Sequence, residues 1–188
     1  MQLDLGGVEA IQAALLELPS VVDTLEDVGS QAVEVSQWMK RLETLLAAKR
    51  LPVAATVASH RSVLIAANRG RIHEDIEILG KPSRSKLVLA TASMVLERAV
   101  SDVRSVLDPE EARFTEGARL AMQLVAVAQA KGVVAPDPGT PPEIESVVSW
   151  LDSASADPDL TGGFANLTAL VGRSDSLTLL VRSLEQAR

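Results

Sequence analysis

An acidic segment near residue 160 has the residue types of a calcium-binding loop. Asp157, Asp159, Thr161 and Gly162 follow the early positions of a loop whose oxygen atoms bind Ca²⁺. The twelfth position of such a loop is a glutamate that holds the ion with both oxygens, but here it is Thr168. Because ligand number and charge both fall short, we expect this segment to cap the next helix, with calcium binding as the alternative.

The two histidines suggest different roles. His60 lies between Val57 and Leu64 at helical spacing, which predicts a half-buried ring that forms a hydrogen bond across a bundle. The alternative for His60 is a pH-sensitive group, because histidine titrates near neutral pH. His73 and Glu77 are four residues apart and would share a helix face. Two ligands do not make a metal site, so we expect a solvated ion pair there.

The sequence offers no recognisable catalytic motif. It contains no cysteine, which excludes a thiol nucleophile, a disulfide and cysteine-ligated metals within the chain. Residues 80–83 read Gly-Lys-Pro-Ser, but Pro82 separates Lys81 from the hydroxyl residue, so they do not form a phosphate-binding loop. No serine lies in a nucleophile-elbow motif. We therefore expect a protein that is not an enzyme and that uses no cofactor.

Charge is distributed in blocks along a chain whose net charge is -7. Residues 1–39 contain seven acidic residues and no Lys or Arg, whereas residues 40–86 contain ten basic residues and four acidic ones. In one interpretation the two blocks neutralise each other, with Glu17 and Asp23 near Lys81 and Arg84. In the other, the basic residues form a patch for an acidic partner or a nucleic-acid backbone. That patch would comprise Arg61, Arg69, Arg71, Lys81, Arg84 and Lys86.

Apolar spacing indicates which elements would position these groups. Steps of three and four residues form a continuous heptad seam, as in a coiled coil. Its members are Leu25, Val28, Ala32, Val35, Met39, Leu42 and Leu46. We predict a short first helix that ends at Pro19, a long helix from near Ser20 to near Arg50, and a third helix after Pro52.

The remaining helices follow from similar patterns. Residues 84–106 present a second apolar face that begins with Leu89. Asp108 and Pro109 resemble a helix start, so we predict a separate helix from there to Lys131. Residues 71–79 fit either a helix or a short strand, and helical neighbours favour the helix.

Together these elements predict an all-α fold, an antiparallel up-and-down bundle of four long helices with a small helical C-terminal lobe. The expected domains are an N-terminal bundle over residues 1–131, a Pro/Gly linker over 132–141 and a lobe over 142–188 that packs on the bundle.

The function that this pattern favours is helix–helix interaction. We predict a non-enzymatic interaction or assembly module that binds a protein partner or itself, with Val22, Val33 and Leu45 as the self-association surface. The alternative is a regulatory protein that binds DNA or another polyanion through residues 40–86, although nucleic acid is the less favoured partner. No membrane span and no secretory signal are expected, which indicates a cytoplasmic protein. Arg outnumbers Lys 13 to 5, as in the proteins of GC-rich bacteria.

Overall fold

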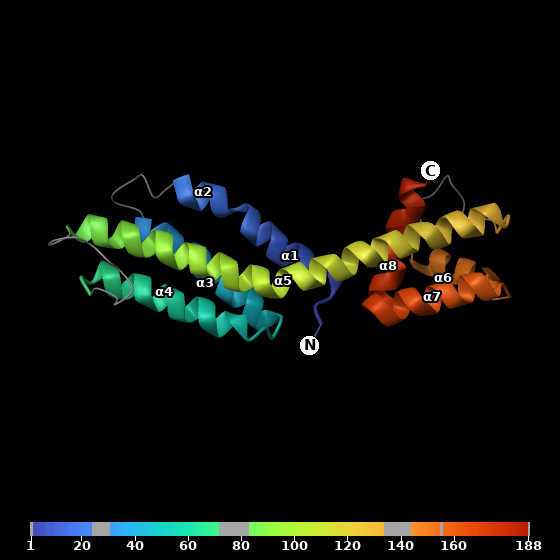
Figure 1. Ribbon diagram of the computed structural model, residues 1–188, viewed down its shortest axis with the longest axis horizontal. Coiled ribbons are helices and arrows are strands. Elements are labelled where there is room, and N and C mark those ends of the chain that lie inside the picture. Colours follow the sequence, from blue (N-terminus) through green and yellow to red (C-terminus); the bar gives the residue numbers. More distant parts are fainter. Residues whose placement is uncertain (1, 24–30, 72–82, 134–143, 155, 188) are drawn as a thin grey trace. The chain divides into compact units, whose positions relative to one another are not determined.

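A computed structural model of the chain describes residues 2–23, 31–71, 83–133, 144–154 and 156–187. The fold is all-helical, as predicted, and the described residues contain no strand (Figure 1). The helices are α1 (Leu5–Leu16), α2 (Leu18–Asp23), α3 (Gln31–Ala48), α4 (Val53–Asn68), α5 (Arg84–Ala130), α6 (Ile144–Ala154), α7 (Pro158–Val171) and α8 (Arg173–Gln186). The ambiguous segment 71–79, including His73 and Glu77, lies almost entirely outside the described residues.

The break between α1 and α2 has its cause in Pro19. Proline has no N–H to donate to the carbonyl of Leu15, so the helical ladder cannot continue without interruption. Trp38 of α3 donates from Nε1 to the carbonyl of Ala14 at 3.0 Å, which satisfies an acceptor near the end of α1. The helix is therefore interrupted close to this proline, although α1 already ends at Leu16 and Pro19 itself lies inside α2. The long helix predicted from near Ser20 to near Arg50 is described as α2 and α3, and residues 24–30 between them lie outside the described residues.

Helices α3 and α4 lie side by side and form a helical hairpin (Figure 1). The described part of the predicted seam is buried from Val35 to Leu46. On α4 the apolar face of Val53, Val57, Leu64 and Ala67 is also buried. Periodicity therefore identified the aliphatic part of this core, but not Trp38 of α3, which is also buried.

Helix α5 corrects the predicted division at Asp108. Two helices were expected, over 84–106 and 109–131, but α5 is one helix of 47 residues with Pro109 inside it. Proline removes the hydrogen bond to the carbonyl of Ser105, which belongs to an exposed residue and can bond to water instead. No turn therefore separates the two predicted helices. Leu89 was placed on the apolar face of this segment, yet it is 39% exposed.

The chain forms two compact units. The first comprises Gly6–Asp108, and the second comprises Pro109–Arg188 together with Gln2–Leu5. The boundary therefore falls within α5 at Pro109, whereas the sequence suggested a boundary at residues 132–141. Most of that predicted linker lies outside the described residues.

In the second unit, α6, α7 and α8 pack against one another. The C-terminal half of α5 approaches α7 and α8 closely at Gly117. A Cβ atom at this position would lie 2.8 Å from Cγ1 of Val171 and 3.0 Å from Cδ1 of Leu179. Gly172 joins α7 to α8 with a φ of 87°, a conformation that favours glycine. Glycine thus permits both the close helix contact and the sharp turn.

Candidate functional site

The three residues predicted for self-association do not form one surface. Val33 lines a groove of about 330 Å³ between α3 and α4. Leu45 is half-buried on another side of α3, in a groove of about 400 Å³ that it shares with Ala10 and Ala14 of α1. Val22 is exposed on α2. The structure therefore divides the predicted surface between two grooves and a separate helix.

Part of the basic block is neutralised within the first unit. Glu43 accepts from Lys40 at 2.8 Å and from Arg61 at 3.0 Å, and these hydrogen bonds, that from Lys40 above all, lower the pKa of the Glu43 carboxyl. Arg41 pairs with Glu17 at 2.7 Å. Glu17 was expected beside Lys81 and Arg84, but Arg84 instead donates to the side chain of Asn68 at 3.3 Å.

The remaining members of the predicted patch lie near the ends of α4 and α5. Arg69, Arg71, Arg84 and Lys86 are exposed, and Lys81 lies outside the described residues. Arg61 is engaged with Glu43 and does not contribute an open charge. Elsewhere in the block, Lys40, Arg41 and Arg50 are exposed as well, and Lys40 and Arg41 are paired with Glu43 and Glu17.

The groove between α3 and α4 combines one residue of the predicted self-association surface with one residue of the predicted basic patch. Its walls contain Val33 from α3 and Leu64 and Ile65 from α4, and Arg69 lies at its edge. Asn68, which accepts the hydrogen bond from Arg84, also lines it. The result is an apolar groove with positive charge at one end, which we call the α3–α4 groove. The sequence named Val33 and Arg69 in separate hypotheses and did not bring them together.

His60 makes the hydrogen bond that its half-buried position suggested. Its Nε2 lies 2.8 Å from Oδ2 of Asp102, which connects α4 to α5 within the first unit. Because an ionised carboxylate only accepts, Nε2 carries the proton in this pair. The pH sensitivity of His60 stays a prediction.

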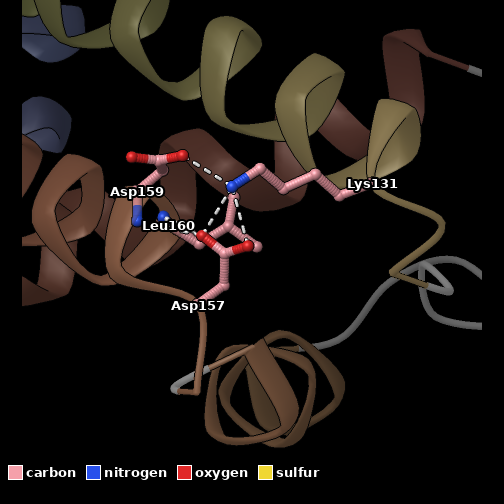
Figure 2. A network of polar contacts seen from close by, with 4 residues as sticks. All are labelled: Lys131, Asp157, Asp159 and Leu160. Atoms are coloured by element: carbon pink, nitrogen blue, oxygen red, sulfur yellow. Dashed lines mark hydrogen bonds and ion pairs between the residues drawn. The ribbon is translucent and has the colours of Figure 1, made fainter.

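The Asp157 segment is a helix cap and does not have the form of a calcium loop. Asp157 accepts from the backbone N–H groups of Asp159 and Leu160, and the residues that would have formed the loop are already helical. The ammonium group of Lys131 lies 2.6–2.8 Å from oxygens of Asp157 and Asp159 (Figure 2). The hydrogen bond from Lys131 lowers the pKa of Asp157, and the two carboxylates raise the pKa of Lys131. An intramolecular cation thus lies between these acids.

Sequence reasoning missed an arginine at the centre of the second unit. The Arg113 side chain is 12% exposed, pairs with Glu110 at 2.6 Å and stacks over the ring of Phe114 at 4.3 Å. It also donates to the backbone carbonyls of Leu3 and Leu170. Leu3 is 110 residues away in the sequence. A basic residue three positions after an acid on a helix suggests an ordinary surface pair, so no local signal marks this role.

One segment of the described chain, Leu5–Asp23, is long and apolar enough to cross a membrane by length and composition alone. No membrane span was expected from the sequence, and this segment contains the charged residues Glu9, Glu17 and Asp23. A core helix of a soluble protein meets the same test. Val8, Ile11 and Leu15 are buried, so the segment contributes to the core of the first unit.

Comparison with other proteins adds no further assignment. No family model, curated protein or solved structure matches the chain. Within the described ranges, no group of three or more His, Cys, Asp or Glu residues could hold a metal ion. The candidate sites therefore rest on geometry alone, and the α3–α4 groove is the candidate that combines apolar surface with charge.

Proposed function

We propose that the protein is a non-enzymatic helical interaction module that self-associates through the α3–α4 groove. The observation that carries the proposal is the position of Val33, which is 50% exposed and lines a groove with Leu64 and Ile65. Large apolar side chains exposed beside a concave apolar surface favour association, because contact removes that surface from water.

Charge favours a second copy of this chain as the partner. Arg69 gives the groove a positive edge, whereas residues 1–39 contain acids and no bases. Helix α2 carries Val22 and Asp23, both exposed, and follows the exposed Leu16. This acidic and apolar surface of one copy complements the groove of another. Since the two surfaces differ, the contact is head-to-tail and extends into rings or filaments.

We extend the proposal to the arrangement of the first unit. An up-and-down bundle would contain α1 with α2, then α3, α4 and the N-terminal half of α5. Three contacts support this order: Trp38 bonds α3 to α1, α3 and α4 pack as a hairpin, and His60 bonds α4 to α5. The sequence prediction took the fourth helix of the bundle from residues 109–131, the C-terminal half of α5. In this arrangement α1 and α2 take its place.

Light scattering of the full chain over a range of concentrations tests the proposal. The wild type should gain mass as concentration rises, and Val33→Glu should lose that gain because it places an acid in the apolar groove. Met122→Glu is the matched control, since Met122 is 47% exposed on α5 of the second unit. A wild type that stays monomeric, or equal effects of the two substitutions, would contradict the proposal.

A second candidate is binding of DNA or another polyanion. The observation that favours it is the exposure of Arg69, Arg71, Arg84 and Lys86 near one another in sequence at the ends of α4 and α5. Retention on heparin should fall steeply with added salt and should weaken in Arg71→Ala. No retention at low salt would exclude this candidate and leave self-association unaffected.

A further inference from the structure

Residues 2–4 precede α1 without regular secondary structure, Leu5 is the first residue of α1, and residues 2–5 pack with the second unit, from which they are remote in sequence. The side chains of this segment alternate: Leu3 and Leu5 are 5% and 7% exposed, and Asp4 between them is exposed. The carbonyl of Leu3 accepts from Nη2 of Arg113 at 2.5 Å. The N–H of Leu5 donates to Oδ2 of Asp175 at 3.3 Å. We call residues 2–5 the strap.

The groups that hold the strap are themselves held by the second unit. Glu110 binds the guanidinium of Arg113, the ring of Phe114 lies beneath it, and the carbonyl of Leu170 accepts another of its N–H groups. Asp175 lies in the first turn of α8. Since these contacts do not involve the strap, the guanidinium of Arg113 is preorganised for one backbone carbonyl, and Asp175 of α8 offers a carboxylate to one backbone N–H.

We infer that the second unit carries a recognition site for an extended Leu-x-Leu segment, which its own strap fills and which the strap of a second copy can also fill. The site reads two backbone groups and buries two leucines, a combination that recognises an extended peptide. The chain passes to the first unit at Gly6, within α1. The inference goes beyond the proposed function, because it involves the other unit and no part of the α3–α4 groove.

The intact chain should resist exchange. A segment tethered nearby acts at an effective concentration on the order of millimolar, so a strap from another copy competes poorly while the internal one is intact. Leu3→Asp with Leu5→Asp should vacate the site, because both substitutions would bury a carboxylate. Arg113→Ala should instead damage the site and leave the strap intact.

Complementation between two full-length variants tests the inference. One variant carries Leu3→Asp and Leu5→Asp, the other carries Arg113→Ala, and both carry Val33→Glu so that the α3–α4 groove cannot contribute. Neither variant alone combines a strap with a site, but their mixture has one of each. We expect light scattering to show about twice the mass for the mixture. A mixture of folded variants that keeps the mass of its components would overturn the inference.

A labelled peptide of residues 1–7 supplies a second measurement. The strap variant should bind it saturably and about tenfold more tightly than the wild type, and adding Arg113→Ala should remove the gain. Arg119→Ala is the matched control, since Arg119 pairs with exposed Glu116 on the same helix. If the strap variant loses its helical circular dichroism, Leu3→Ala with Leu5→Ala replaces it. A folded strap variant that binds no peptide at about 1 mM would show that the strap is only a packing contact.

Discussion

Replacing Gly117 with alanine should destabilise the second unit even though alanine is the better helix former. The new Cβ would lie 2.8 Å from Cγ1 of Val171 and 3.0 Å from Cδ1 of Leu179, so one of these side chains must move. Val171 is β-branched and buried, which leaves it little rotameric freedom within α7. Overpacking of this kind costs about 1–3 kcal/mol in the free energy of unfolding.

Gly162 provides the matched control for this substitution. It also lies within a helix, but a Cβ there would have no neighbour within 4 Å among the described atoms. Gly162→Ala should therefore raise the free energy of unfolding by about 1 kcal/mol, the gain in helix propensity. Gly117→Ala gains the same amount and loses about 1–3 kcal/mol to crowding, so its net effect is a loss of up to about 2 kcal/mol.

Urea denaturation followed by circular dichroism measures both variants. The double variant Gly117→Ala with Val171→Ala should be more stable than the sum of the two single effects predicts, because each relieves the strain or cavity of the other. Equal stabilisation by Gly117→Ala and Gly162→Ala would refute the reasoning. It would mean that α5 does not approach α7 and α8 as closely as the 2.8 Å separation indicates.

Three further predictions follow from other contacts. Trp38→Phe removes the donor to the carbonyl of Ala14 and should lower the free energy of unfolding, measured by urea denaturation, by about 1–3 kcal/mol. Trp150→Phe should lower it less, because Nε1 of Trp150 is buried without a hydrogen-bond partner among the described residues. Pro109→Ala restores a donor for the carbonyl of Ser105 and should stabilise the chain by up to about 3 kcal/mol, read as a higher Tm. The pKa of Asp157 is lowered by Lys131, so its contribution is complete above about pH 4 and is lost as the pH falls through the lowered value; Lys131→Ala should flatten the acid dependence of Tm. A slope in Lys131→Ala equal to that of the wild type would contradict this last expectation.

Local periodicity predicted the elements whose burial depends on a neighbouring helix in sequence. Val35 to Leu46 on α3 and Val53 to Ala67 on α4 are buried at the expected positions, because a hairpin buries the stripe that each helix presents. The same rule failed at Leu89, which continues the apolar spacing of α5 but is exposed. Leu87, Val88 and Ala92 around it are buried, so Leu89 lies at the edge of the covered stripe of α5, and spacing does not say how wide that stripe is.

Among the candidate sites, too, the local contacts could be predicted from the sequence and the long-range contacts could not. The cap at Asp157 was predictable, because an Asp before Pro158 satisfies the N–H groups of the following turn. Its partner Lys131 comes from 26 residues away, and no sequence signal connects them. The contact of Arg113 with Leu3 spans 110 residues and involves a backbone carbonyl, which every residue possesses. Recognition of backbone atoms leaves no pattern of side chains to find.

At Pro109 the local sequence signal for a helix start and the observed continuous helix α5 disagree. Asp108 and Pro109 have the chemistry of a helix start, yet continuing the helix sacrifices one hydrogen bond at a cost of about 3 kcal/mol. Leu107 before the proline and Phe114 after it are both buried, and each such side chain contributes about 1.5–3 kcal/mol. The burial on the two sides therefore outweighs the lost bond and keeps α5 continuous. The two compact units still divide at this residue. Helix α5 belongs to the first unit up to Asp108 and to the second unit from Pro109 onward.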